Sequence, residues 1–166
     1  PSPCGIGENN LISAAIDTAT GFAYFGTGTT PGAVVKVRLS DFTRVGGLVL
    51  NSGENSLVSA TIDAANGFAY FGTNTTPGII VKVRLSDFTR LSALTLNTGE
   101  NSPFSAMLDA ANGFAYFGTS TTPGIVVKVR LSDFTRNAGL TLNPGENSPQ
   151  AAGIVTSKGF AYFATN

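Results

Sequence analysis

The sequence has no histidine, no tryptophan and a single cysteine, Cys4. Metal sites built from histidine or from several cysteines, Ser-His-Asp triads and Cys-His dyads are excluded, because each needs residue types that the chain lacks. The cysteine has no partner within the chain, although an odd cysteine in a secreted protein can pair with a cysteine of another chain. We therefore expect a non-enzymatic protein.

Charge is also scarce, at 12% of the 166 residues, and the ten basic residues balance the ten acidic ones. A neutral chain without a basic cluster has no field that attracts nucleic acid or an anionic membrane surface. No apolar run reaches the roughly 18 residues that a membrane-spanning helix needs. Hydrophobic residues nevertheless make up 42% of the chain, which is enough for a packed core. These features indicate a folded protein with no nucleic-acid partner and no membrane span.

What the sequence does contain is an internal repeat of 46 residues. The segment GFAYF begins at four glycines with this spacing, which are Gly21, Gly67, Gly113 and Gly159, and VKVRLSDFTR recurs three times at the same interval. A repeat of this length is typical of solenoids, propellers and other arrays. The repeat divides the chain into an N-terminal segment, 1–6, three full units, 7–52, 53–98 and 99–144, and a partial fourth unit, 145–166.

Each full unit is predicted to hold four short strands and no helix. In the second unit they cover about 57–62, 68–72, 79–85 and 91–96. Apolar and charged residues alternate in the third of these, where Lys82 and Arg84 alternate with Val81, Val83 and Leu85, and this period of two is typical of a strand. Asn-Gly and Pro-Gly pairs separate the strands, and both pairs favour tight turns.

Four antiparallel strands in a repeat of 40–50 residues indicate a blade of a β-propeller. We therefore expect an all-β fold of β-propeller-type blades, with the small residues of the first strand innermost. Phe68, Phe71, Val81 and Val83 and their equivalents should be buried, with the aromatic residues filling the space between blades. A β-solenoid is the alternative, but solenoid coils are usually shorter and parallel and lack turn signals of hairpin type.

The segments AYFGT and VVKVRLSDF, together with the period of 46 residues, give the chain a family resemblance. It resembles the highly repetitive YVTN- and NHL-like propeller arrays of bacterial and archaeal surface or secreted proteins. The resemblance covers nearly the whole chain and implies a propeller fold and an extracellular or cell-surface location. It does not define a function, since propellers host enzymes, lectins, scaffolds and adhesins.

The repeat count does not complete a ring. Closed propellers use about four to eight blades, whereas the chain holds about 3.6 units and its fourth unit ends at Asn166, before the third and fourth strands. The chain is then a piece of a longer array, a subunit that assembles with other copies into a ring or filament, or an open array capped by its fourth unit. Its last strand should expose an edge carrying Phe160, Tyr162 and Phe163. Another chain, or further residues of the same polypeptide, should cover this edge, and Pro1–Ile6 of a neighbouring copy is the leading candidate, by strand addition.

A Glu-Asn pair recurs in each loop that joins one unit to the next. In a propeller these loops share one face with the Thr-Thr-Pro-Gly loops, and carboxylate, amide and hydroxyl groups together can bind sugar hydroxyls or Ca²⁺. The alternative is that these side chains satisfy backbone N–H groups of their own loops. The candidate residues are Glu8, Asn9, Glu54, Asn55, Glu100, Asn101, Glu146 and Asn147.

Two further sets of charged residues recur with the repeat. Asp17, Asp63 and Asp109 precede the first turn of each unit, where an aspartate typically caps the turn. The charged residues of the third strand and of the turn that follows it, Lys82, Arg84, Asp87 and Arg90 in unit two, are expected to form a ladder of ion pairs between blades.

The sequence thus favours a non-enzymatic extracellular structural or interaction module whose partners are other copies of itself or further repeats of the same polypeptide. A lectin-like propeller that binds glycans through its equivalent loops is the alternative. No catalytic residue, cofactor or metal site is predicted, and Ca²⁺ is the one ion that the available oxygen ligands would suit.

Overall fold

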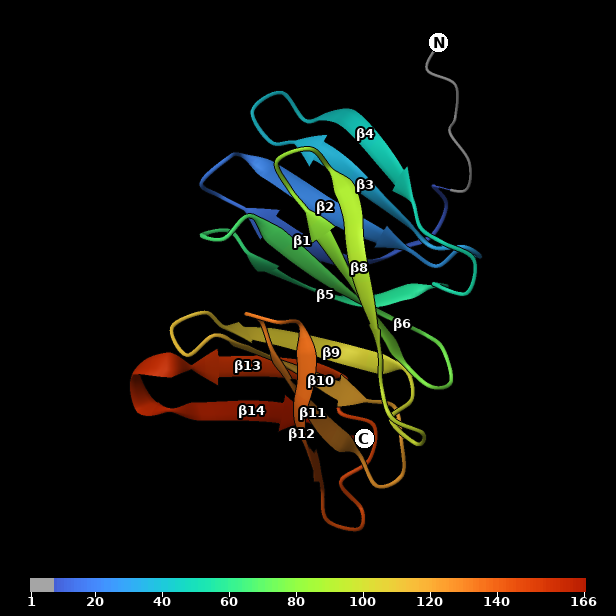
Figure 1. Ribbon diagram of the computed structural model, residues 1–166, viewed down its shortest axis with the longest axis vertical. Helices are drawn as coiled ribbons and strands as arrows, with labels where there is room; N and C mark the ends of the chain where they lie inside the picture. The colour runs from blue at the N-terminus through green and yellow to red at the C-terminus, as the bar shows by residue number, and fades with distance from the viewer. Residues whose placement is uncertain (1–7) are drawn as a thin grey trace.

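The computed structural model describes residues 8–166, which form three four-stranded antiparallel sheets and one two-stranded sheet (Figure 1). Cys4 and the segment Pro1–Ile6 lie outside the described residues. We call the sheets blade one, blade two, blade three and half-blade four. Blades one and two comprise β1 (Leu11–Asp17), β2 (Phe22–Thr27), β3 (Ala33–Arg38) and β4 (Thr43–Val49), then β5 (Leu57–Asp63), β6 (Phe68–Thr73), β7 (Ile79–Arg84) and β8 (Thr89–Thr95). Blade three and half-blade four comprise β9 (Pro103–Asp109), β10 (Phe114–Thr119), β11 (Ile125–Arg130) and β12 (Thr135–Thr141), then β13 (Ala151–Val155) and β14 (Phe160–Ala164).

The predicted strand plan is confirmed. Within each sheet the strands lie in chain order and every neighbouring pair is antiparallel. The observed bounds agree with the predicted ones to within two residues, the largest difference being the fourth strand of blade two, which begins at Thr89. In the described part of the chain no helix has the length and apolarity required to cross a bilayer.

One short helical turn corrects the expectation of no helix. Residues Thr156–Lys158 form a 3₁₀ turn between β13 and β14. In the other units an aspartate accepts hydrogen bonds from the turn that follows it, as Asp63 does from the N–H of Asn66 at 3.2 Å. The fourth unit has Val155 at that position, so the turn closes instead through the N–H of Gly159, which donates to the Thr156 carbonyl at 3.2 Å.

The first strand of each unit is innermost, as predicted. β1 contacts β5, β5 contacts β9 and β9 contacts β13. Hydroxyl groups join these strands, because Ser59 Oγ donates to the Pro103 carbonyl at 2.6 Å and Ser105 Oγ to the Pro149 carbonyl at 2.8 Å. The units follow one another around an arc that stays open between blade one and half-blade four (Figure 1).

The core lies between blades. We call the side of a blade that meets the following blade its trailing face, and the side that meets the preceding blade its leading face. The trailing faces contribute Tyr24, Val34 and Leu50 from blade one and Tyr70, Ile80 and Leu96 from blade two. The leading faces contribute Ala69, Phe71, Val81, Val83 and Leu85 from blade two and Ala115, Phe117, Val127, Val129 and Leu131 from blade three.

The predicted core residues are buried in blades two and three apart from Phe68 and Phe114, whereas Phe25 and Val37 of blade one are only half-buried and Phe160 is exposed. Phe71, Val81 and Val83 are fully buried, as predicted. Phe68 is only half-buried, because it lies under the Lys82 ammonium group and not between the two apolar faces. The same pair of faces meets twice in the chain, so the two interfaces are near copies of each other.

Candidate functional site

The recurring glutamates bind arginines of their own units. Arg90 Nε donates to Glu54 Oε1 at 3.0 Å and to Oε2 at 2.9 Å, and Arg90 Nη2 also contacts Oε1. The backbone N–H of Asn51 donates to the same carboxylate at 3.0 Å, and only 5% of the Glu54 side chain is exposed. Glu100 and Arg136 repeat this pair, while Glu8 and Arg44 form a more exposed version of it. These three carboxylates are therefore occupied by the fold.

The unit-joining loops and the Thr-Thr-Pro-Gly loops lie on one face, as predicted. The N–H of Gly78 donates to the Glu100 carbonyl at 2.8 Å, and the N–H of Ser102 donates to the Thr75 carbonyl at 3.0 Å. Asn9 is exposed. The Oδ1 atoms of Asn55, Asn101 and Asn147 are buried and accept no hydrogen bond from the described residues.

Glu146 departs from the pattern of the other glutamates. Its Oε2 accepts a hydrogen bond from the N–H of Asn143 at 2.8 Å, but no ion pair forms on it within residues 8–166. In the other units the arginine partner comes 36 residues after the glutamate, and the same distance from Glu146 leads past Asn166. The carboxylate is exposed.

The predicted ladder of ion pairs between blades is wrong. Arg84 pairs with Asp87 and Arg130 with Asp133, each within one exposed turn, and Arg90 pairs with a glutamate of its own unit. Hydrogen bonds from Arg84 and Thr89 lower the pKa of Asp87 to about 2. The recurring aspartates cap their turns as predicted, and Asn66 Nδ2 donates to Asp63 Oδ2 at 2.8 Å.

Lysine and aromatic side chains, which the sequence analysis did not connect, form the polar link between blades. The Nζ atom of Lys82 lies 3.9 Å from the centre of the Phe68 ring, 5.7 Å from that of Tyr70 and 5.6 Å from that of Phe134 in the next blade. Lys36 makes the same three contacts, with Phe88 as the ring from the next blade. Burial lowers the pKa of Lys82. A signal was present in the sequence, because lysine is the charged residue that recurs opposite the tyrosine of the neighbouring strand.

The third copy of this cluster is incomplete. Lys128 lies 3.7 Å from the centre of the Phe114 ring and 5.7 Å from that of Tyr116, and no third ring approaches it in the described part of the chain. Tyr116 is half-buried, whereas Tyr24 and Tyr70 are buried. The trailing face of blade three is therefore covered only in part.

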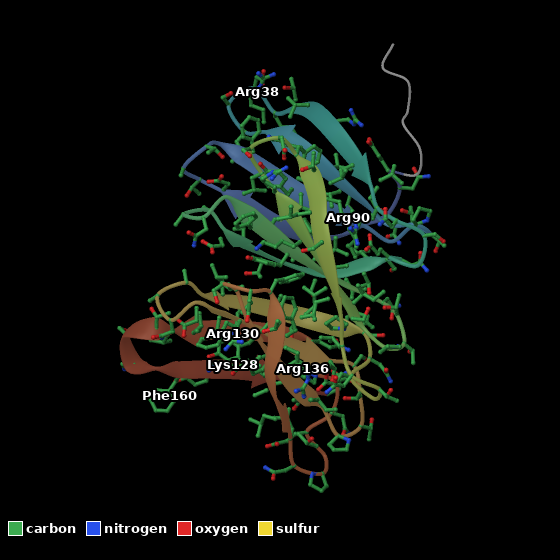
Figure 2. The ribbon with its side chains drawn as sticks, in the orientation of Figure 1. Arg38, Arg90, Lys128, Arg130, Arg136 and Phe160 are labelled. Atoms are coloured by element: carbon green, nitrogen blue, oxygen red, sulfur yellow. The ribbon has the colours of Figure 1, made fainter. Side chains whose placement is uncertain are left out.

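An apolar groove lies over this uncovered part, between blade three and half-blade four. It encloses about 450 Å³. We call it the blade-four groove; its wall includes Tyr116, Val126, Lys128, Leu142, Glu146 and Phe163. On the far side of β14, Phe160 and Tyr162 are 60% and 59% exposed, and Phe160 projects outward (Figure 2). Of the three predicted edge residues, two thus face solvent and Phe163 lines the groove.

The leading face of blade one is open in the same way. Phe42 is 81% exposed, and Leu39 is also exposed, whereas Leu85 and Leu131 at equivalent positions are buried. Phe42 has a positive φ of 51°, like Phe88 and Phe134 at 52° and 53°, a backbone conformation that is uncommon for phenylalanine. Phe88 and Phe134 use it to place their rings 5.9 Å and 5.7 Å from the tyrosines of the preceding blade. Phe42 holds the same position without a tyrosine.

No protein-family model matches the chain, and no curated protein matches its sequence. The fold is similar to that of hydrazine synthase from Kuenenia stuttgartiensis, with a TM-score of 0.74 and 8% identity over 86% of this chain and 38% of that one. It is also similar to the WD40 repeats of RRP9 and to U3-55K, each with a TM-score of 0.72 and 7% identity, over 86% of this chain and 41% and 42% of theirs. WD40 repeats build β-propellers. The chain is an open β-propeller.

These similarities define the fold alone, because so low an identity transfers no site residues. The propeller spans about two-fifths of the length of each of the three solved structures. Its blades are arranged like theirs, and its exposed groups must be interpreted from its own residues.

We expect a metal chelator to leave the thermal midpoint of unfolding unchanged. Within residues 8–166 no three metal-ligating side chains gather, and Glu54 and Glu100 are held by arginines. Thermal unfolding with and without EDTA tests this. A large loss of thermal stability with EDTA would contradict it and would restore the Glu-Asn loops as Ca²⁺ sites.

We also expect the propeller to lose stability as the pH rises from 10 to 12. Burial, assisted by the charge of Asp17, raises the pKa of Tyr24 to about 12, and burial raises the pKa of Tyr70 as well. Between these pH values the unfolded chain ionises its tyrosines while the folded chain keeps them protonated, so the unfolded state binds fewer protons and gains population. Urea unfolding across this range should show a shallower loss for Tyr24→Phe; an equal slope in both proteins would contradict the assignment.

Proposed function

We propose that this open propeller is a non-enzymatic structural or interaction module that joins further units of its own repeat type. One observation carries the proposal. The interface between trailing and leading faces forms twice within the chain, and apolar residues of the same interface type are exposed at each end of the described propeller, at Phe42 of blade one and at Phe160 and Tyr162 of half-blade four. Exposed apolar surface of this kind marks an interaction site, and the face that fits each half is one that the repeat itself encodes.

The chemistry of the recurring polar groups supports a non-enzymatic role. The aspartates cap turns and the buried glutamates hold arginines, so these carboxylates are not free to transfer protons to a substrate. Hydrazine synthase has a similar fold, but a shared fold does not carry an activity with it. The resemblance to repetitive surface propellers supports an extracellular or cell-surface location, with other copies of the chain or further repeats as partners.

The glycan-binding alternative depends on the loop face. On this face Asn9 and Glu146 are exposed to a ligand, but Glu54 and Glu100 are already paired with arginines. A glycan array distinguishes the two functions. Saturable binding of one sugar class that is lost in Glu146→Gln would favour the lectin, whereas the structural role predicts no such binding.

The direct test adds one blade. A copy of residues 53–98 placed before residue 7 should present a tyrosine-bearing trailing face to blade one, bury Phe42 and raise the thermal midpoint. Phe42→Ser in the lengthened chain should remove most of that gain, while Val155→Ser, a matched change of an exposed apolar residue on β13, should leave it intact. An added blade that unfolds independently, with no gain for blade one, would overturn the proposed function.

A further inference from the structure

The blade-four groove lacks three contacts that the equivalent places in the chain possess. Lys128 meets two aromatic rings, where Lys36 and Lys82 meet three. Glu146 has no arginine within residues 8–166, where Glu54 and Glu100 each have one. The places of these two missing contacts lie close to strand β14, because Lys128, Glu146 and Phe163 line the same groove.

The third missing contact is a strand. β10 pairs with β9 on one side and with β11 on the other, whereas β14 pairs with β13 alone among the described strands. The free edge of β14 borders the groove through Ala161 and Phe163. An unpaired edge presents backbone N–H and C=O groups that favour the addition of another strand.

We propose that the blade-four groove binds a β-hairpin of the repeat's own third-and-fourth-strand type, added to the free edge of β14. The hairpin is recognised by the pattern Val-x-Val-x-Leu-x-x-Phe-x-Arg, which in blade three is carried by Val127, Val129, Leu131, Phe134 and Arg136. The inference rests on the proposed function, that the chain joins units of its own kind, and specifies which segment binds and where.

The apolar residues of that pattern match the groove by direct analogy with the interface between blades two and three. There, Val127, Val129 and Leu131 pack against Tyr70, Ile80 and Leu96. The wall of the groove offers the equivalent trailing-face residues, Tyr116, Val126 and Leu142. Ala161 and Phe163 already occupy the positions that Ala115 and Phe117 hold in blade three, so the inner half of the interface is formed and the outer half is open.

The phenylalanine and the arginine of the pattern supply the two missing side-chain contacts. Phe134 places its ring 5.7 Å from that of Tyr70 and 5.6 Å from Lys82 Nζ, and the corresponding position beside Tyr116 and Lys128 is open. Arg136 reaches back to Glu100, and the corresponding carboxylate is Glu146. The segment Pro1–Ile6, predicted from the sequence as the cover, contains neither phenylalanine nor arginine and would satisfy only the backbone edge.

The test uses the 166-residue chain and a synthetic peptide with the sequence of residues 121–142. We expect saturable binding and slowed hydrogen exchange at Phe160–Ala164. Arg136→Ala in the peptide and Glu146→Gln in the chain should each weaken binding about tenfold or more, and the two changes together should add little to either, because they remove the same ion pair. The glutamine keeps an acceptor for the N–H of Asn143, so the loop is preserved.

Arg130→Ala in the peptide is the matched control. Arg130 pairs with Asp133 inside the exposed turn and should change binding less than twofold, as is typical of an exposed pair. If Arg130→Ala and Arg136→Ala weaken binding equally, or if a peptide of residues 1–6 protects Phe160–Ala164 as well as the hairpin does, the proposal is wrong.

A second experiment joins the hairpin covalently to the chain, so that the proposal is tested even if the free peptide does not fold. The same 22 residues appended after Asn166 should protect Phe160–Ala164 and raise the thermal midpoint, and Phe134→Ser in the appended copy should cancel the gain. If neither the peptide nor the appended hairpin protects β14, the groove does not bind such a hairpin. If the hairpin does not protect β14 while a blade added before residue 7 still buries Phe42, this inference is wrong and the proposed function is retained.

Discussion

Replacing Arg90 with alanine should lower the free energy of unfolding by about 2–4 kcal/mol. The change leaves the Glu54 carboxylate buried without its cation, and 5% of that side chain is exposed to solvate the charge. The expected loss lies slightly below the usual range for breaking a buried pair, because 24% of the Arg90 side chain reaches solvent and water already screens part of the interaction. Equilibrium unfolding in urea measures it.

Arg84→Ala is the matched control for this prediction. Arg84 and Asp87 are also bonded through two arginine nitrogens, but both side chains are close to half exposed, so their pair should contribute little that can be measured. Equal losses for Arg84→Ala and Arg90→Ala would show that burial of Glu54 does not set the energy of the pair.

Gly72→Ala should destabilise the propeller by about 1–3 kcal/mol, as overpacking of a close contact does. A Cβ atom at Gly72 would lie 2.6 Å from the backbone carbonyl oxygen of Pro103 in the next blade and 2.4 Å from Ser59 Oγ. The serine can rotate, but then it loses its hydrogen bond to that carbonyl. The backbone of Pro103 can move away only if the inner strands of blades two and three separate, so the change acts on the blade interface itself.

Gly153→Ala provides the comparison for Gly72→Ala. Gly153 lies in β13, and a Cβ atom there would meet nothing within 4 Å, so its replacement should be close to neutral. Thermal unfolding of both variants tests the close approach of the inner strands. A neutral Gly72→Ala would contradict the observed packing of blade two against blade three.

The strands and turns were predictable because their signals are local and are copied in each unit. The period-two pattern around Lys82 and Arg84 predicts a strand without knowledge of its neighbours, and the Asn-Gly pairs fix the turns. The 3₁₀ turn at Thr156–Lys158 was missed because it depends on the loss of one capping aspartate in the fourth unit.

The roles of the charged residues were harder to predict because their partners are set by packing. Glu54 meets Arg90 across 36 positions of sequence, and the predicted ladder between blades assumed pairs that the strand register does not bring together. The third ring over Lys82 comes from the next blade, so no pattern within one unit contains it. The place where these contacts are missing, around Lys128 and Glu146, becomes visible only when the three copies are compared in space.

The central claim is that the leading face of blade one, around Phe42, and the face of half-blade four that carries Phe160 and Tyr162 are halves of one repeated interface. Light scattering of the 166-residue chain from micromolar to near-millimolar concentration tests it most directly. Because one molecule exposes both halves, we expect head-to-tail association, with the average mass rising above 17.0 kDa as the concentration increases and rising less in Phe42→Ser. A soluble chain that stays at 17.0 kDa throughout, with the amides of Phe160–Ala164 exchanging freely, would contradict the account.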